Sequence, residues 1–158
     1  MYSLEIDITA QEMRVFADGE VIKIYSISTG KNGAGELRDT GKTPRGRHVI
    51  RAKIGTSAPE NAVFVARRQT GEIYNPDMRV QFPDRDWILT RIFWLSGLEP
   101  GKNRLGDVDT MRRYIYIHGA PDDVQMGVPG SKGCIRMRNS EIIELFNLVP
   151  AGTVVNIR

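Results

Sequence analysis

The chain has 158 residues, of which 41% are hydrophobic, so it can bury one sizeable core. No stretch rich in Pro, Gly or Ser divides it, and we expect a single domain over residues 1–158. Its 22 basic and 19 acidic residues give a net charge of +3 with the basic side chains scattered, which weakly favours an anionic substrate. A nucleic-acid partner is not expected, because such proteins usually carry a basic stripe with interleaved aromatic residues.

Hydropathy argues against membrane insertion and export. No apolar run approaches the roughly 18 residues that cross a bilayer. The N-terminus also lacks the charged, apolar and small-residue zones of a signal peptide. We therefore expect a cytoplasmic protein whose single cysteine stays reduced. The alternative is a periplasmic protein whose N-terminus is truncated.

A period of two dominates the chain and predicts strands. Leu4, Ile6 and Ile8 alternate with polar residues, as in a half-buried strand. A second strand leads into Asp18-Gly19, which is a strong signal for a two-residue hairpin turn. We expect this second strand at residues 13–17 and further strands at residues 21–27, 47–54, 62–67, 87–95, 113–118 and 153–157.

Two features between these strands are weak functional candidates. Residues 35–43 resemble a phosphate-binding loop, but Glu36 replaces a required glycine and Pro44 follows where a helix should begin, so we expect an ordinary loop. His48 lies in a strand without a partner at metal-ligand spacing, and we interpret it as an ordinary strand residue. Residues 55–109 are expected to supply a lid or a substrate wall.

One segment has helical periodicity. Asn139 and Ser140 are good capping residues, and Ile142 and Phe146 continue an apolar stripe that Pro150 ends. The fold class predicted from the pattern is therefore mainly β, with one well-defined helix after the cysteine.

The most reactive residues stand close together in the sequence. Cys134 follows glycines that let the chain fold back, and His118 ends a strand and precedes Gly119. A thiol with an ordinary pKa of about 8.5 needs a base or a positive field to become a nucleophile, and His118 can supply the base. The alternative is a small buried cysteine and a structural histidine. Two histidines and one cysteine are too few for a closed zinc site, and we expect no metal and no cofactor.

Four segments together resemble a known family, the L,D-transpeptidase catalytic domain, also called the YkuD domain. They are the opening strands, Thr43-Pro44-Arg45-Gly46, Tyr116-Ile117-His118-Gly119 and Ser131-Lys132-Gly133-Cys134-Ile135-Arg136-Met137. The resemblance covers essentially the whole chain. It implies a fold like a β-sandwich, and a cysteine that attacks the bond between the third residue, commonly meso-diaminopimelate, and D-alanine of a peptidoglycan stem tetrapeptide or muropeptide.

The resemblance also implies roles for individual residues. Cys134 is the nucleophile, His118 the general base, and the backbone carbonyl of Gly119 steadies the imidazole. The N–H groups of Lys132, Gly133 and Cys134 form the oxyanion hole. Candidate substrate contacts are Arg136, which binds a carboxylate or else braces the loop, and Lys132, Tyr116 and Ser131. Tyr114, Trp87 and Trp94 either line the groove or belong to the core.

Most members of this family carry Ser-His-Gly-Cys, whereas this chain has Lys132 in place of the second histidine. Lys132 could lower the thiol pKa, pair with a substrate carboxylate or simply be a solvated loop residue. Together with the absence of an export signal, this departure favours an L,D-carboxypeptidase of cell-wall recycling, with water as the acceptor. The alternatives are an exported L,D-transpeptidase that forms peptidoglycan cross-links and a non-catalytic wall-binding module.

Overall fold

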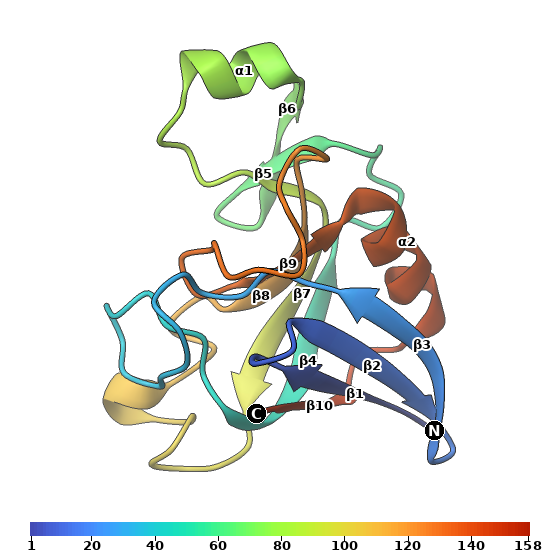
Figure 1. Ribbon diagram of the computed structural model, residues 1–158, viewed down its shortest axis with the longest axis vertical. Coiled ribbons are helices and arrows are strands. Elements are labelled where there is room, and N and C mark those ends of the chain that lie inside the picture. The colour runs from blue at the N-terminus through green and yellow to red at the C-terminus, as the bar shows by residue number, and fades with distance from the viewer.

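The computed structural model describes all 158 residues and shows a mainly β fold built on one curled ten-stranded sheet (Figure 1). In chain order the elements are β1 (Tyr2–Asp7), β2 (Glu12–Ala17), β3 (Glu20–Ser26), β4 (Gly46–Ile54), β5 (Ala62–Val65), β6 (Arg68–Ile73), α1 (Pro76–Gln81), β7 (Ile88–Gly97), β8 (Tyr116–Ala120), β9 (Ile135–Arg138), α2 (Asn139–Leu148) and β10 (Val154–Ile157). A 3-10 turn spans Gly106–Val108.

Strand β7 organises the sheet. The strands follow the order β3-β2-β1-β10-β4-β7-β5-β6, and β8 pairs with the other edge of β7. Strand β9 then pairs with β8 in parallel. Residues 131–134, which we call the cysteine loop, stand directly before β9 and beside the start of β8. The sheet therefore brings the histidine and the cysteine together.

The core lies between the curled sheet and α2. A cluster of 19 buried residues combines side chains from β1, β2, β7, β8, β9 and β10 with the apolar face of the helix. Ile117 and Ile135 are fully buried in this cluster and are aligned across the β8–β9 pair. Since side chains alternate along a strand, the residues on either side of them face the opposite way.

Helix α2 confirms the predicted helix but begins differently. Its N-cap is Arg138, which makes no side-chain capping bond, so the expected capping role of Asn139 was wrong. The side chain of Asn139 is instead buried and accepts a hydrogen bond from Thr90 Oγ1 while donating to Asn61 Oδ1. Tertiary contacts of this amide have replaced the local cap.

The strand predictions hold for most of the chain, but two strands are shorter than expected and other elements were not predicted. The predicted strand at 62–67 stops at Val65 because Ala66 and Arg67 form a turn with positive φ, and β6 returns from it. The strand expected at 113–118 begins only at Tyr116, since Tyr114 has φ of 56°. The strands β6 and β9 and the helix α1 were not predicted.

Helix α1 had a readable signal. Asn75 caps it by accepting a hydrogen bond from the N–H of Met78, and Pro76 occupies the first helical turn. With β5 and β6 it forms a projection at one end of the sheet (Figure 1). None of the helices has the length and apolar character required to cross a bilayer.

Candidate active site

Four of the expected site residues share one face of the β8–β9 pair. The register aligns His118 with Arg136, and Cys134 stands immediately before β9, beside Tyr116. These positions alternate with the core residues Ile117 and Ile135, so their side chains lie on the face opposite the core. Period-two alternation has therefore assembled the thiol, the imidazole and a guanidinium on one surface.

The resting thiol is neutral. Sγ of Cys134 accepts a hydrogen bond from the N–H of Tyr116 at 3.3 Å and donates to the carbonyl of Tyr114 at 3.4 Å. Burial of the sulfur raises the pKa of Cys134 to about 12, with a further increase from Asp86, although the Tyr116 N–H and nearby arginines act in the opposite direction. No hydrogen bond joins Sγ to His118 in this state.

The imidazole is held in one orientation and is also neutral. His118 is almost fully buried, and its Nδ1 lies 2.6 Å from the carbonyl oxygen of Gly119. That carbonyl can only accept a hydrogen bond, so Nδ1 carries the proton and Nε2 is left as the basic nitrogen. Burial lowers the pKa of His118, partly offset by Asp86 and by the Gly119 carbonyl. A neutral base therefore stands beside a neutral thiol.

Gly119 must be a glycine for reasons of space. A Cβ at this position would collide with Asn139 Oδ1 and with the carbonyl of Leu89. The buried Asn139 amide that abuts it is tied to Asn61 and Thr90. The residue that follows His118 is thus packed closely against a buried hydrogen-bond network of Asn139, Asn61 and Thr90.

The cysteine loop is closed by two hydroxyl groups. Ser131 is buried, and its Oγ donates to the carbonyl of Cys134 and accepts the N–H of Gly133 at 3.1 Å. Thr43 Oγ1, fully buried, donates to the carbonyl of Gly133 and accepts the N–H of Gly30. Gly133 itself has φ of +120°, which disfavours any side chain there.

These bonds change the expected oxyanion hole. The N–H of Gly133 is engaged by Ser131, whereas those of Lys132 and Cys134 make no hydrogen bond within the protein. The free pair, two residues apart on a fixed loop, can stabilise an oxyanion, so the assignment of Gly133 as a donor does not fit this structure. Likewise Ser131 binds its own loop rather than lining the cavity that contains the thiol.

Three cavities meet at Lys132. The thiol cavity, of about 440 Å³, is lined by Cys134, Tyr116, Arg67, Arg113 and Asp86 among others. A polar cavity of about 300 Å³ adjoins it and is lined by Arg79, Arg85, Asp84, Asp86 and Arg136 among others. A basic cavity of about 410 Å³ also adjoins it and is lined by Arg38, Arg112 and Arg113 among others. Lys132 lines all three cavities. The residue that departs from the expected motif therefore occupies the junction of the site.

Comparison with known proteins identifies the family of the chain. The family model described as the L,D-transpeptidase catalytic domain matches residues 1–157. The chain belongs to this family. It is 46% identical over 156 residues to the Bacillus subtilis protein named L,D-transpeptidase YkuD, covering 99% of this chain but only 65% of that protein.

Solved structures show the same fold. An Enterococcus faecium L,D-transpeptidase C442S mutant matches 99% of this chain and 49% of its own, with a TM-score of 0.60 and 20% identity. The L,D-transpeptidase LdtMt1 in complex with imipenem matches 99% of this chain and 58% of its own, with a TM-score of 0.58 and 18% identity. This L,D-transpeptidase domain thus spans about half to two thirds of the relatives it matches.

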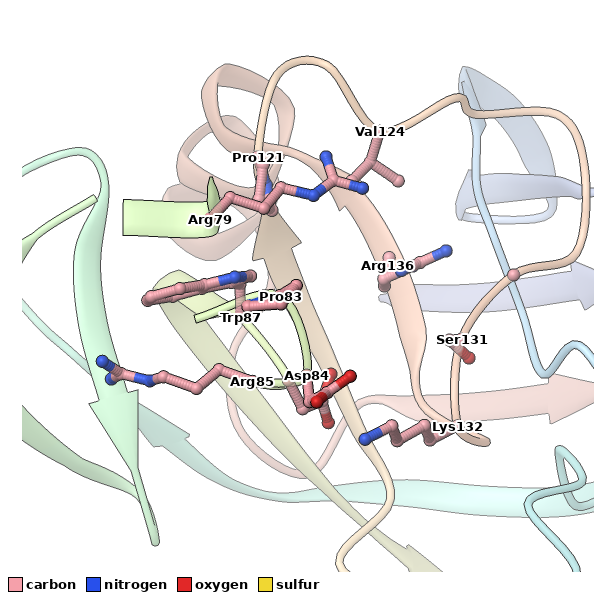
Figure 2. Close-up of a pocket in the computed structure, with 12 residues that line it drawn as sticks. Arg79, Pro83, Asp84, Arg85, Trp87, Pro121, Val124, Ser131, Lys132 and Arg136 are labelled. Atoms are coloured by element: carbon pink, nitrogen blue, oxygen red, sulfur yellow. The ribbon is translucent and has the colours of Figure 1, made fainter. Parts of the chain in front are cut away.

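The polar cavity of this L,D-transpeptidase domain contains Arg136 (Figure 2). The Arg136 guanidinium donates to Ser28 Oγ at 3.0 Å and packs against Gly130, and its buried Nε has no partner. It does not line the thiol cavity. Of the two roles considered for Arg136, the contacts favour bracing of the loop that precedes Cys134.

Several residues of the candidate site were missed by the sequence analysis. Arg113 donates to the carbonyl of Lys42 at 2.6 Å and reaches the thiol cavity, and Arg67 donates to the hydroxyl of Tyr116 at 2.9 Å. The Arg67 guanidinium also lies 4.4 Å from the ring centroid of Trp94. Only Thr43 had a visible signal, because it stands in the Thr-Pro-x-Gly segment. Asp86 and both arginines depend on long-range folding.

The aromatic residues divide between groove and core. Tyr114 and Tyr116 line the thiol cavity, whereas Trp94 does not line it and packs against both of these rings and against the Arg67 guanidinium. Trp87 packs edge-on against Tyr74 in a separate small core. His48 is buried with both ring nitrogens engaged, as a structural residue would be. No cluster of three or more His, Cys, Asp or Glu side chains could hold a metal ion.

Proposed function

We propose that this domain is a cysteine-dependent L,D-carboxypeptidase that removes the terminal D-alanine from peptidoglycan tetrapeptides during cell-wall recycling. The observation that carries the proposal is the shared face of β8 and β9, where Cys134 adjoins a cavity and His118 is held as a neutral base. The scissile bond joins the third residue, meso-diaminopimelate, to D-alanine. Binding alone would require neither a fixed tautomer nor free N–H groups beside a thiol.

Acylation begins from the neutral pair. As Sγ of Cys134 attacks the carbonyl carbon, its proton passes to Nε2 of His118, and the carbonyl oxygen becomes an oxyanion facing the N–H groups of Lys132 and Cys134. The carbon–nitrogen bond then breaks, His118 returns the proton to the departing amine, and D-alanine leaves. The product is a thioester between Cys134 and the third residue.

Hydrolysis completes the cycle. Water attacks the thioester carbonyl while His118 Nε2 takes one of its protons. The carbon–sulfur bond breaks, the proton passes to the sulfur, and a tripeptide with a free carboxylate leaves. The neutral thiol and imidazole are restored, so one water molecule is consumed for each bond cleaved.

The charges around the thiol support D-alanine as the leaving group. Arg67, Arg113 and Lys132 line the thiol cavity against a single acid, Asp86. An excess of positive charge favours a substrate that ends in a carboxylate. It also disfavours entry of a charged ammonium acceptor, whereas neutral water is unaffected. Of the two cations considered for the carboxylate, Lys132 lines this cavity and Arg136 does not.

Incubation with a free tetrapeptide tests this function. The protein should release D-alanine and the tripeptide without any added amine, while Cys134→Ala should release neither. Product that forms only when an amino acceptor is supplied would contradict the carboxypeptidase. Binding of the tetrapeptide by both proteins, with no release of D-alanine by either, would point to a non-catalytic binding module.

The second candidate is a transpeptidase that joins two diaminopimelate residues in exported peptidoglycan. The names of the relatives favour it, since both the B. subtilis protein and the solved structures are called L,D-transpeptidases. A dimeric product from two tetrapeptides, formed in preference to hydrolysis, would support it. Fractionation of cells that express the natural gene separates the cytoplasmic location proposed with the carboxypeptidase from a periplasmic one.

A further inference from the structure

The polar cavity holds more charge than the reaction at the thiol requires. Four basic residues (Arg79, Arg85, Lys132 and Arg136) and two acidic residues (Asp84 and Asp86) line it. Two of the bases are neutralised outside the lining, because Arg79 pairs with Asp123 at 2.8 Å and Arg85 pairs with Glu72 at 2.9 Å. Two acids and two bases remain without an ion pair.

The structure keeps Arg85 turned away from the neighbouring acids. Its guanidinium makes two hydrogen bonds to Glu72 and stacks 4.3 Å from the centroid of Trp87, which is itself buried. Figure 2 shows the side chain of Arg85 directed away from Ser131 and Lys132. These contacts fix the chain on both sides of Asp86, and the Asp86 carboxylate itself makes no hydrogen bond or ion pair within the protein.

Asp86 also occupies a special place among the acids. It lines both the polar cavity and the thiol cavity, whereas Asp84 lines only the polar cavity. The negative charge of Asp86 affects both candidate reacting groups, because it acts to raise the pKa values of Cys134 and His118. A carboxylate at this position opposes formation of the thiolate, and a bound cation would cancel that effect.

We infer that Asp86 is a specificity-determining residue that binds an ammonium group on the side chain of the third residue of the substrate. Arg136 has no ion pair in the same cavity and is not needed for the carboxylate of D-alanine, so it then faces a carboxylate beside that ammonium, and the cavity complements a zwitterionic side-chain end. This inference rests on the proposed function for the position of the peptide. It adds the residue that selects the side-chain charge.

Two tetrapeptides that differ only at the third residue test the role of Asp86. One carries lysine and the other Nε-acetyllysine, which lacks the positive charge. The wild-type protein should prefer the lysine peptide by about tenfold or more in kcat/KM, and Asp86→Asn should lose this preference. The preference is the ratio of the two kcat/KM values, so any effect of the Asp86 charge on Cys134 and His118, which is common to both peptides, cancels. Asp84→Asn is the matched control, and it should keep the preference.

Several results would overturn the inference. They are an unchanged preference in Asp86→Asn, an equal loss on both peptides, or a preference carried by Asp84 instead. A loss confined to added amine acceptors, with hydrolysis unchanged, would also overturn it, because Asp86 would then bind the acceptor.

Binding separates this inference from the proposed function. Cys134→Ala protein should bind the lysine peptide more tightly than the acetylated one by calorimetry, and Cys134→Ala,Asp86→Asn should bind both equally. If the wild-type protein releases no D-alanine but this binding difference appears, the carboxypeptidase proposal fails and the role of Asp86 stands. Equal binding of the two peptides by Cys134→Ala would contradict the role of Asp86.

Discussion

The two histidines of this protein are buried in similar ways on the two strands β4 and β8, which both pair with β7, and only one of them is left with a free nitrogen. His48, on β4, has Nδ1 3.0 Å from the carbonyl of Gly46 and Nε2 2.9 Å from Thr110 Oγ1. His118, on β8, has Nδ1 2.6 Å from the carbonyl of Gly119, and its Nε2 makes no hydrogen bond within the protein. In both cases a glycine carbonyl fixes the ring.

The difference between the two rings is the basis on which we propose His118, and not His48, as the general base. Burial lowers the pKa of both imidazoles, so burial alone does not distinguish a catalytic histidine from a structural one. The distinction lies in the second nitrogen: at His48 a threonine occupies it, and at His118 it remains available on the face that carries Cys134. Substitutions at the two sites should therefore separate activity from stability.

The largest effect is expected at His118. His118→Asn should lower kcat/KM for D-alanine release by about 10²–10⁴-fold, the usual contribution of a general base. His48→Gln, the matched variant, should leave kcat/KM within about threefold of wild type. A large loss of activity in His48→Gln at a temperature where it remains folded would contradict the division between the two histidines.

The second prediction concerns the resting thiol. With a pKa raised to about 12, Cys134 should react with iodoacetamide at a rate that increases about tenfold per pH unit from pH 7 to pH 10 without reaching a plateau. His118→Asn should change this rate little, because the resting thiol bonds to Tyr114 and Tyr116 rather than to the imidazole. A plateau near pH 7, lost in His118→Asn, would indicate a thiolate–imidazolium pair instead.

Stability at acidic pH should depend on His48. Burial lowers its pKa to about 4, whereas the unfolded chain has an ordinary value near 6.5. Between these values the unfolded state binds the extra proton, so the free energy of unfolding decreases as pH decreases from 6.5 to 4 and is unaffected above 6.5. The free energy of unfolding should decrease by about 3 kcal/mol over this range, because each pKa unit of the difference corresponds to about 1.4 kcal/mol.

Urea unfolding of wild-type and His48→Gln proteins across pH 4 to 7 measures this contribution. The variant should lose much of the pH dependence, and the part that remains includes His118, whose pKa is lowered in the same direction. An identical pH dependence in the variant would exclude His48 as a source.

The smallest effects are expected at the two glycines whose carbonyls orient the rings. A Cβ at Gly119 would collide with Asn139 and Leu89, and one at Gly46 would collide with Glu99 and require φ of +101°. Either change to alanine should cost about 1–3 kcal/mol in the free energy of unfolding. Only Gly119→Ala should also lower kcat, because it displaces the imidazole that we propose as the general base. Equal kinetic effects of the two changes would remove the distinction.

Local patterns predicted most of this architecture. Alternation located most of the strands but not β6 or β9. The Tyr116-to-Gly119 and Ser131-to-Met137 segments indicated the candidate pair of His118 and Cys134, because those signals lie in consecutive residues. The role of Asn139 was misjudged, since its capping propensity is local but its partners, Asn61 and Thr90, lie on other elements. Asp86 was not found at all: its importance comes from two cavities that exist only after the loop before β7 packs against the cysteine loop.

The mass of the intact protein after incubation with imipenem tests the central claim most directly. The account predicts one covalent adduct on the wild-type protein, formed at a similar rate in His48→Gln, at least about a hundredfold more slowly in His118→Asn and not at all in Cys134→Ala. An adduct on Cys134→Ala, or equal rates in His118→Asn and the wild-type protein, would contradict the claim that Cys134 and His118 act as nucleophile and base.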